Sequence, residues 1–557
     1  MTNNDNESAT DELLLEMRGL CIEGEADEVW HEIVKGIDLK LHRGEVLGLI
    51  GESGAGKSTI GLAAMGFARP GCRISAGEIL FDGKDLMKVS EKERRKLRGA
   101  RISYVAQSAA AAFNPAHKLI EQFSEAPTQH GIKNKSAADA DAKDLYRRLQ
   151  LPNPESIGYR YPHQVSGGQL QRAMTAMAMA CRPDLIIFDE PTTALDVTTQ
   201  IEVLVTIRDI VKQFNTAAIY ITHDLAVVAQ MADRIMVLRF GELVEESNTR
   251  SMLSDPQEDY TKSLWAVRSH RKEVEPPAKT DTPIVKIDHV SASYGPIPVL
   301  HDITFEIHKG YTVAVVGESG SGKSTAARVI TGLLPPKQGQ VYYEGEPLPA
   351  DYRKRSKDQL RQAQMIYQMP DTAINPRQRI RDIVGRPLSF YLGYSGAKRE
   401  ERVRELLELI ELDPDQFIDR HPGELSGGQK QRICIARALA AEPKFIICDE
   451  VTSALDQMVA EGILKLLDRL QRELDLSYMF ITHDLATVKA IADEIVVMYQ
   501  GKIVEQGPKT EIVTPPHHDY TELLLSSVPE MDADWLDNVL KERERAHALY
   551  EKFHAES

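Results

Sequence analysis

The chain has 557 residues, which is too long for one ordinary hydrophobic core and suits two to four domains. With 42% hydrophobic and 27% charged residues, it has the composition of a globular protein, which argues against a disordered or membrane-embedded chain. The formal net charge of -16 disfavours general nucleic-acid binding, because such binding depends on basic surfaces that neutralise phosphates.

The N-terminal segment and the cysteines indicate a cytoplasmic protein. The first residues, MTNNDNESATDELLLEMRG, lack the basic start and apolar core of a secretory signal. No uninterrupted apolar run approaches the roughly 20 residues of a spanning helix, so a membrane role has to come through a partner. The five cysteines show no metal-site spacing, and we interpret them as reduced packing residues.

The first patterned segment is a strand, a glycine-rich loop and a helix. The run Val46 to Ile50 predicts a buried strand, and a helical pattern extends from Ser58 to Met65. The loop GESGAGKST fits the phosphate-binding pattern GxxxxGK[ST], in which glycines let backbone N–H groups approach an anion at a helix N-terminus. We expect Lys57 to reach the β- and γ-phosphates of ATP and Ser58 to bind Mg²⁺. The predicted ATP-binding residues are Gly51, Glu52, Ser53, Gly54, Ala55, Gly56, Lys57, Ser58 and Thr59.

Two further predicted strands end in residues suited to ATP hydrolysis. The run Leu185 to Phe188 is followed by Asp189, which can hold Mg²⁺ through water, and by Glu190, which can polarise the attacking water. The run Ala217 to Thr222 is followed by His223, which can hydrogen-bond the γ-phosphate or that water. Strands that alternate with helices predict a largely parallel sheet with its chemistry at the carboxyl ends.

The second half of the chain repeats the first. GESGAGKST recurs 266 positions later as GESGSGKST, and SGGQ, the Asp-Glu pair and ITHDLA recur 260 positions later. Two homologous domains with small loop deletions would give this pattern, and the Pro-rich segment from Glu273 to Pro283 is the predicted linker. Asp449 and Ser324 are the second pair of Mg²⁺ candidates, and Glu450 and His483 the second catalytic pair. The second ATP-binding loop is Gly317, Glu318, Ser319, Gly320, Ser321, Gly322, Lys323, Ser324 and Thr325.

Two further motifs carry a family resemblance. VSGGQ (Val165 to Gln169) and LSGGQ (Leu425 to Gln429) resemble the signature sequence that separates ATP-binding-cassette (ABC) proteins from other P-loop ATPases. The resemblance covers nearly all of Leu13 to Leu525. SGGQ is also a nest of backbone N–H groups near a helix start, which suits a γ-phosphate.

The resemblance implies roles for residues outside the phosphate loops. It implies that each signature contacts the ATP held by the opposite cassette, so that two cassettes pair head to tail. We expect this pairing within one chain, with pairing across two chains as the alternative. The implied signature contacts are Ser166, Gly167, Gly168, Gln169, Ser426, Gly427, Gly428 and Gln429. Gln107 and Gln368 are then Q-loop residues that touch Mg²⁺ and the attacking water, and Tyr294 stacks on adenine. Thr193 to Asp196 and Ser453 to Asp456 match the D-loops.

These features predict an α/β fold with two tandem P-loop NTPase (ABC) domains. Each domain is expected to have a mostly parallel sheet, an antiparallel β edge and an inserted helical subdomain. The expected bounds are 11–270 for the first domain with its tail motif, 271–283 for the linker, 284–530 for the second domain and 531–557 for an amphipathic helix. That helix is predicted from the spacing of Trp535, Leu536, Val539 and Leu540, and we expect it to pack on its own cassette, with a regulatory or dimerising role as the alternative.

Two departures from the family pattern predict unequal sites. The adenine-stacking aromatic of the first cassette falls on Gly24, so stacking there is weak or comes from Trp30. The second cassette has DEVT, with Val451, where DEPT is usual. Because neither change removes a phosphate, Mg²⁺ or catalytic group, we expect both sites to hydrolyse ATP, at different rates, with one purely structural site as the alternative.

The tails of the two cassettes resemble one importer subfamily. YPHQVSGGQ, the Asn-Pro pairs at Asn114 and Asn375, and the tails DPQEDYTKSL and PPHHDYTELL resemble the oligopeptide, dipeptide and nickel importer ATPases. This implies peptides or related small solutes as cargo, two integral-membrane permease subunits, a solute-binding protein, and a place on the cytoplasmic face of the inner membrane. Neither tail contains a cysteine, so we expect no iron–sulfur cluster.

The main alternative is a tandem cassette that acts on ribosomes without a membrane partner. That class would show a long, charged, helical linker and basic patches, whereas this linker is short and Pro-rich and the chain is acidic. A DNA-repair or chromosome-structure ATPase would need zinc-binding cysteines or an inserted coiled coil, and the sequence shows neither.

Overall fold

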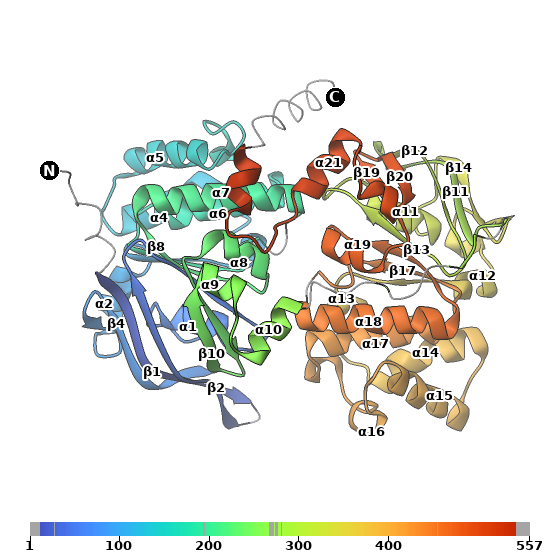
Figure 1. The fold of residues 1–557 in the computed structure, drawn as a ribbon, viewed down its shortest axis with the longest axis horizontal. Coiled ribbons are helices and arrows are strands. Elements are labelled where there is room, and N and C mark those ends of the chain that lie inside the picture. The colour runs from blue at the N-terminus through green and yellow to red at the C-terminus, as the bar shows by residue number, and fades with distance from the viewer. Residues whose placement is uncertain are drawn as a thin grey trace. The chain divides into compact units, whose positions relative to one another are not determined.

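The computed structural model describes residues 12–26, 28–192, 195–266, 272, 277–279, 281–453 and 455–541. They form two compact units (Figure 1). The first unit contains the described residues up to Ala266 and those from Pro529 onward, and the second contains the described residues from Lys272 to Val528. Residues 271, 273–276 and 280 of the predicted linker 271–283, and residues 542–557 of the predicted C-terminal helix, lie outside the described residues.

A six-stranded sheet forms the centre of the first cassette, in the order β10-β9-β3-β8-β7-β6. Neighbouring strands from β9 to β6 are parallel, and β10 is antiparallel to β9. All residues of β3, β7 and β8 are buried, as expected for apolar strands covered on both faces. The strands are β3 (Val46–Gly51), β6 (Ile102–Val105), β7 (Leu185–Asp189), β8 (Ala217–Ile221), β9 (Arg234–Arg239) and β10 (Glu242–Asn248).

An antiparallel sheet and a set of helices complete the first cassette. The second sheet has the order β2-β1-β4-β5, with β1 (Leu13–Ala26), β2 (Val29–His42), β4 (Cys72–Phe81) and β5 (Lys84–Asp85). Between β6 and β7 the chain forms the inserted helical subdomain, which includes α3 (Ala109–Ala112), α4 (Leu119–Gln129), α5 (Lys135–Arg148) and α6 (Gly167–Ala178). The other helices are α1 (Lys57–Ala63), α2 (Glu91–Leu97), α7 (Val197–Phe214), α8 (Leu225–Met231), α9 (Thr249–Ser254) and α10 (Asp259–Ala266).

The second cassette repeats both sheets. Its six-stranded sheet has the order β16-β17-β18-β13-β19-β20, and its antiparallel sheet has the order β12-β11-β14-β15. The strands of the first are β13 (Thr312–Val316), β16 (Ala363–Ile366), β17 (Phe445–Asp449), β18 (Ser477–Ile481), β19 (Glu494–Tyr499) and β20 (Lys502–Pro508). Those of the second are β11 (Val285–Tyr294), β12 (Ile297–Ile307), β14 (Gln338–Tyr343) and β15 (Glu346–Pro347).

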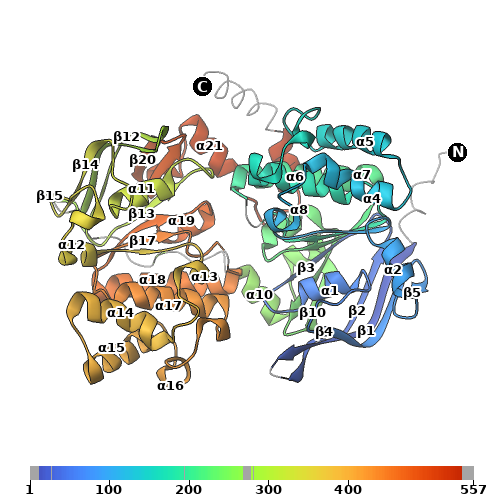
Figure 2. The same cartoon turned by 180° about the vertical axis from the view of Figure 1, so that it is seen from behind.

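The helices of the second cassette follow the same plan. The inserted subdomain contains α13 (Pro370–Ala373), α14 (Ile380–Leu392), α15 (Gly396–Leu409), α16 (Pro414–Phe417) and α17 (Gly427–Leu439), and Figure 2 shows α14, α15 and α17 grouped at one end of this cassette. The remaining helices are α11 (Lys323–Ile330), α12 (Lys357–Gln362), α18 (Gln457–Leu474), α19 (Leu485–Ile491), α20 (Lys509–Ile512) and α21 (Asp519–Ser526). The predicted α/β fold is confirmed in both units. Within the described parts of the chain, no helix has the length and apolar character needed to cross a membrane.

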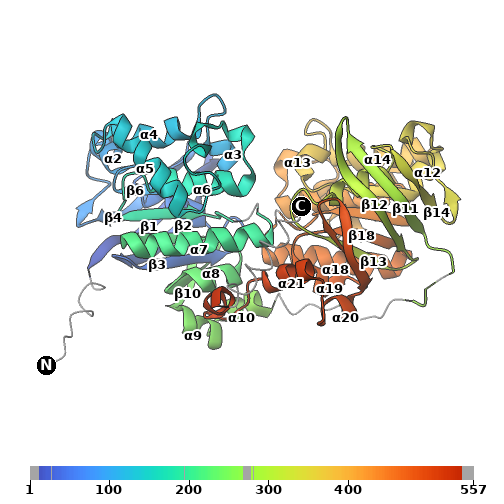
Figure 3. The ribbon, with the colours of Figure 1, turned by 90° about the horizontal axis from the view of Figure 1, so that it is seen from above.

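The C-terminal segment does not pack where the sequence predicted. Its helical turns at 535–541 lie on the first cassette (Figure 3). There Trp535 and Leu536 pack against Ile201 and Val205 of α7. The expectation that this segment packs on its own cassette is therefore wrong. The corresponding positions of α18, counted from the N-cap aspartate of each helix, carry Glu461 and Lys465, which form an ion pair and offer no apolar surface.

Candidate active sites

The first phosphate loop joins β3 to α1. A Cβ at Gly51 would lie 2.1 Å from the carbonyl oxygen of Leu238, so only glycine fits there. Gly56, the N-cap of α1, has a φ of 90° and gives the helix no side-chain cap, which leaves the first amide groups of α1 available to an anion. Lys57 Nζ donates to the carbonyl oxygens of Gly51 (2.6 Å) and Glu52 (2.8 Å), which hold its charge inside the loop.

The second phosphate loop, between β13 and α11, has the same geometry. Lys323 Nζ donates to the carbonyl oxygens of Gly317 (2.7 Å) and Glu318 (2.7 Å), and Gly322 is the left-handed N-cap of α11. Both loops lie at the carboxyl end of a central parallel strand, as predicted. Both therefore fit a bound phosphate chain.

A serine and an aspartate meet beside each loop. Ser58 Oγ donates to Asp189 Oδ1 at 2.8 Å, and Ser324 Oγ donates to Asp449 Oδ1 at 3.0 Å. Both aspartates are buried at the ends of their strands. Hydroxyl and carboxylate oxygens are the ligand types that Mg²⁺ prefers, so each pair fits the predicted role.

Each predicted catalytic glutamate lies between its predicted partners. Gln107 Nε2 donates to Glu190 Oε2 at 2.8 Å, and His223 Nδ1 lies 3.2 Å from Glu190 Oε1. Glu190 follows β7 with a φ of 48°, a backbone conformation that directs the chain sharply out of the strand. The structure thus brings together three residues that are separated by up to 116 positions in the sequence (223 − 107).

The second catalytic set has the same arrangement. Gln368 Nε2 donates to Glu450 Oε2 at 2.5 Å, and His483 Nδ1 lies 3.4 Å from Glu450 Oε1. Glu450 likewise has a left-handed φ, of 49°. The hydrolytic groups of the two cassettes are therefore equivalent.

In both sites the catalytic glutamate raises the pKa of the histidine beside it. Burial by itself lowers the pKa of His223, but the hydrogen bond and charge of Glu190 outweigh it and raise that pKa above its ordinary value. The same balance raises the pKa of His483. Burial raises the pKa of Glu450, yet the hydrogen bond and charge of His483 bring that pKa below its usual range.

Tyr104 is a contact that the sequence analysis missed. Its hydroxyl donates to Asp189 Oδ2 at 2.5 Å, so this carboxylate is held by Ser58 on one oxygen and by Tyr104 on the other. Tyr104 lies opposite Ile187 in the β6–β7 register, and Met365 lies opposite the equivalent Ile447 in the second cassette. The only signal in the sequence was a tyrosine three residues before Gln107.

The signature motifs begin helices in both cassettes. Ser166 caps α6 and Ser426 caps α17, each in a capping box with the glutamine three residues on. A Cβ at Gly168 would lie 2.2 Å from Thr199 Cγ2, so this glycine is required for the packing of α6 against α7. At Gly167 a Cβ would meet nothing within 4 Å, so this glycine is the one open to a ligand. Gly427 and Gly428 show the same contrast, with Val459 Cγ1 at 2.4 Å from a Cβ on Gly428 and the nearest atom to one on Gly427 at 3.7 Å.

The two predicted adenine contacts differ. Tyr294 ends β11, is 40% exposed, and accepts a hydrogen bond from Arg328 at 2.7 Å. In the first cassette the equivalent register position is Gly24, and a Cβ there would lie 2.6 Å from Ile33 Cδ1. Trp30, the predicted substitute, has the Arg73 guanidinium 4.1 Å from its ring centre. Tyr294 and Trp30 are exposed to similar extents, 40% and 36%, but the guanidinium over Tyr294, that of Arg328, lies farther from the ring centre, at 5.9 Å.

The tyrosine of each tail motif reaches its own phosphate loop. The backbone N–H of Glu318 donates to the hydroxyl of Tyr520 at 2.9 Å. In the first cassette Tyr260 lies beside Glu52, whose charge together with burial raises the pKa of the phenol. The repeated sequence DYT, at Asp259 to Thr261 and Asp519 to Thr521, is the sequence signal for these contacts.

Two predicted elements are described only in part. Thr193 and Ala194 of the first D-loop and Ala454 of the second lie outside the described residues. The last residue of each D-loop, Asp196 or Asp456, caps the helix that follows. Val451, the departure in DEVT, is 2% exposed and belongs to the hydrophobic core.

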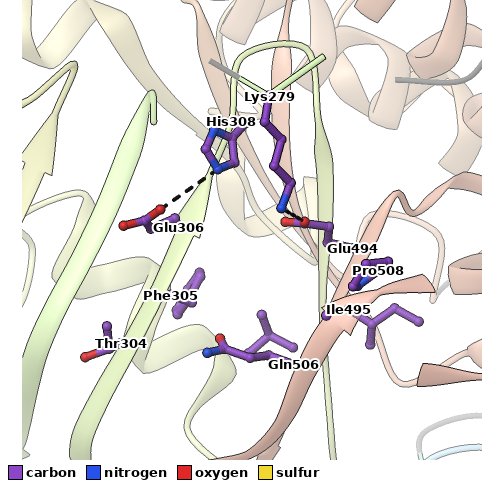
Figure 4. A pocket seen from close by; sticks show the side chains of 11 residues that line it. Lys279, Thr304, Phe305, Glu306, His308, Glu494, Ile495, Gln506 and Pro508 are labelled. Atoms are coloured by element: carbon purple, nitrogen blue, oxygen red, sulfur yellow. Dashed lines mark ion pairs between the residues drawn. The ribbon is translucent and has the colours of Figure 1, made fainter. Parts of the chain in front are cut away.

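A pocket of about 360 Å³ in the second cassette lies apart from these motifs (Figure 4). It is lined by Lys279, Glu306, His308 and Glu494, among others, and Lys279 forms an ion pair with Glu494. Glu494 begins β19, so the pocket lies at the amino end of the parallel sheet, opposite the end that carries the phosphate loop. None of the predicted nucleotide-binding or catalytic residues lines it.

Comparisons with known protein families match both cassettes and the C-terminal region. The family described as ABC transporter matches residues 34–193 and 300–453. The family described as Oligopeptide/dipeptide transporter, C-terminal region, matches residues 504–554.

Two relatives align with this chain over nearly the whole length of both proteins. The Glutathione import ATP-binding protein GsiA of Salmonella choleraesuis is 36% identical, over 96% of this chain and 92% of its own length. The protein of the same name from Escherichia coli O6:H1 is 35% identical, over 95% of this chain and 91% of its own. The solved structure of cbiO1 from Clostridium perfringens, part of the ABC transporter complex cbiONQ, is 28% identical over 42% of this chain and 91% of its own, with a TM-score of 0.38.

Proposed function

This chain belongs to the ABC transporter family, and on that premise we propose that it is the ATP-hydrolysing subunit of an importer for peptides or related small solutes. The observation that carries the proposal is the presence of two intact sets of hydrolytic groups in one chain whose C-terminal region matches the oligopeptide and dipeptide transporters. The relatives named for glutathione import make glutathione, a tripeptide, the first cargo to test. No observation favours the ribosomal alternative.

We propose the following roles within each cassette. ATP with Mg²⁺ supplies the γ-phosphate that water attacks, and the metal lowers the charge that builds up on it. Lys57 and Lys323 exchange their loop carbonyls for phosphate oxygens, while the Ser58–Asp189 and Ser324–Asp449 pairs hold the metal. Glu190 and Glu450 orient and polarise the water, and the glutamine and histidine that already contact each glutamate keep its carboxylate in place.

We further propose that each site is completed by the signature of the opposite cassette. Gly167 and Gly427 carry no side chain where the helix start is open, which suits a γ-phosphate approached by another domain. Closure on two ATP molecules and opening after hydrolysis would then drive the partner. The proposed domain bounds remain 11–270, 271–283 and 284–530.

The partners we propose are two membrane permeases, which dock near Gln107 and Gln368, and a solute-binding protein. The chain would then lie at the cytoplasmic face of the inner membrane as a peripheral subunit. The reason is chemical: the Q-loop glutamines contact the catalytic glutamates directly, so a permease pressing there can change the position of Glu190 or Glu450.

The test is uptake of labelled glutathione and of di- and tripeptides by cells that carry the gene, its deletion, or the double variant Glu190→Gln, Glu450→Gln. We expect the deletion and the double variant to lose the uptake of at least one solute, and Glu473→Gln, an exposed residue outside both sites, to retain it. Unchanged uptake of all these solutes in the deletion strain, with no membrane protein copurifying with the chain, would refute the importer.

A further inference from the structure

The end of α8 in the first cassette is bound to the backbone of the chain's C-terminal segment. Gln230, which is 5% exposed, donates from Nε2 to the carbonyl oxygens of Glu530 (3.1 Å) and Asp532 (2.8 Å). Its Oε1 accepts from the N–H of Leu536 at 3.0 Å. One buried amide therefore pairs with three backbone groups of a segment that lies some 300 positions later in the sequence.

Side chains on two more helices, α7 and α9, extend this contact. We call residues 529–541 the C-terminal strap. Arg250 at α9 makes a two-pronged ion pair with Asp534 (2.6 and 3.0 Å), and Arg208 of α7 pairs with Asp537 (2.8 Å). Together with the apolar packing of the strap on α7, these pairs match basic groups of the cassette to acidic groups of the strap.

The equivalent place in the second cassette receives a different segment of the chain. Ala490 stands at the position of Gln230, 260 residues on, and its carbonyl oxygen accepts from the N–H of Lys272 at 2.9 Å. Lys272 Nζ also makes a buried ion pair with Asp493 at 2.7 Å. The chain that follows the first tail thus binds the second cassette at α19, and the chain that follows the second tail binds the first cassette at α8.

We propose that the surface formed by α7, α8 and α9 of the first cassette is a docking surface for the chain's own strap, and that the docked strap positions the first catalytic site. α8 begins two residues after His223, and α7 begins directly after Asp196 of the D-loop. The strap contacts both helices within about three turns of those loops and continues directly from the second cassette. The apolar side of the strap fits α7 and not α18. The first cassette presents Ile201 and Val205 on α7, whereas the matched positions of α18 carry the charged Glu461 and Lys465.

Hydrogen–deuterium exchange on the full chain tests the docking. We compare the wild type with Gln230→Ala, which removes the amide from the cassette, and with Trp535→Ala, which alters only the strap. Both variants are expected to speed exchange of the strap amides, that of Leu536 above all, by roughly tenfold, while β7 stays protected. Glu461→Ala, at the matched position of the second cassette, should leave strap exchange unchanged. Wild-type strap amides that exchange as fast as a free peptide would overturn the proposal.

ATP turnover tests the positioning role. In a Glu450→Gln background, where the first site does the hydrolysis, Gln230→Ala and Trp535→Ala are expected to lower kcat about fivefold with little change in KM. In a Glu190→Gln background, where the second site hydrolyses the ATP, the same two substitutions are expected to have no effect on kcat. Equal effects in both backgrounds, or none in either, would refute a role at the first site. Neither experiment involves cargo or permeases, so the outcome is independent of the importer proposal.

Discussion

In the first cassette the aspartate that ends β7 is held on both oxygens, by Ser58 and Tyr104, whereas in the second Met365 occupies the place of the tyrosine and brings no hydroxyl. For the predicted adenine surfaces, the second cassette has the more favourable arrangement. The second cassette presents Tyr294, and the first has glycine at that position and a tryptophan already covered by Arg73. We therefore infer that the first cassette is the better suited to hold Mg²⁺ and the second the better suited to stack on adenine.

We expect the adenine surface to affect mainly the affinity for ATP, and the oriented aspartate to affect mainly the rate of hydrolysis. An aromatic face affects how tightly ATP is held, and so acts on KM, while an oriented carboxylate acts on the metal at the reacting phosphate. The glutamate, glutamine and histidine are the same in both sites, so the two should share one hydrolytic mechanism. Single-site variants can break or sharpen this comparison.

The largest effect is expected from the catalytic glutamates. Glu190→Gln and Glu450→Gln should each lower hydrolysis at their own site by about a hundredfold, because the amide cannot polarise water. Steady-state ATPase assays of each single variant then report the other site. We expect the Glu450→Gln chain, which works through the first site, to have the higher KM for ATP. Equal KM and kcat in the two variants would contradict the expected difference between the sites. The double variant gives the ATPase rate that remains when neither glutamate is present.

The next effect tests the adenine surface. Tyr294→Ala, made with Glu190→Gln so that only the second site works, should raise KM for ATP about tenfold through loss of stacking. Tyr294→Phe keeps the ring and should change KM little. Trp30→Ala, made with Glu450→Gln, is expected to have a smaller effect, since Arg73 already covers that ring. A larger effect from Trp30 than from Tyr294 would reverse the assignment.

A smaller effect is expected at the metal. Tyr104→Phe removes the hydrogen bond to Asp189 without changing the ring, and should raise the Mg²⁺ concentration for half-maximal hydrolysis at the first site about fivefold. Met365→Leu is the matched change in the second cassette and should have no effect. Titrations of Mg²⁺ in the two single-site backgrounds measure this, and equal midpoints for Tyr104→Phe and its parent would show that the tyrosine does not orient the carboxylate.

The sequence predicted what is encoded by local spacing. A phosphate loop, its strand and its helix lie within about twenty residues, and the duplication shows each motif twice, so the fold class and the central strands could be predicted. The pairing of Tyr104 with Asp189 depends instead on β6 lying beside β7, a contact between strands about eighty residues apart. Periodicity gives no information about such a pair.

The C-terminal strap shows the same limit at larger scale. Helical spacing predicted that Trp535 and Leu536 share an apolar face, but such a face does not indicate which surface of the protein it packs against. The partner is set by Ile201 and Val205 on α7, which in the sequence look like any buried helix residues. Only the fold shows which of the many apolar helix positions the strap covers.

The smallest effect is expected from the tail tyrosines. Tyr520 accepts a hydrogen bond from the N–H of Glu318, and Tyr520→Phe removes this hydroxyl while keeping the packing of the ring on Tyr499. Since this amide belongs to the phosphate loop, we expect about a threefold rise in KM for ATP at the second site and an unchanged kcat. Tyr260→Phe tests the matched position of the first cassette, where the phenol lies beside Glu52. A fall in kcat from Tyr520→Phe would instead place the tyrosine in the hydrolytic step, and the two cassettes would then differ in mechanism as well as in affinity.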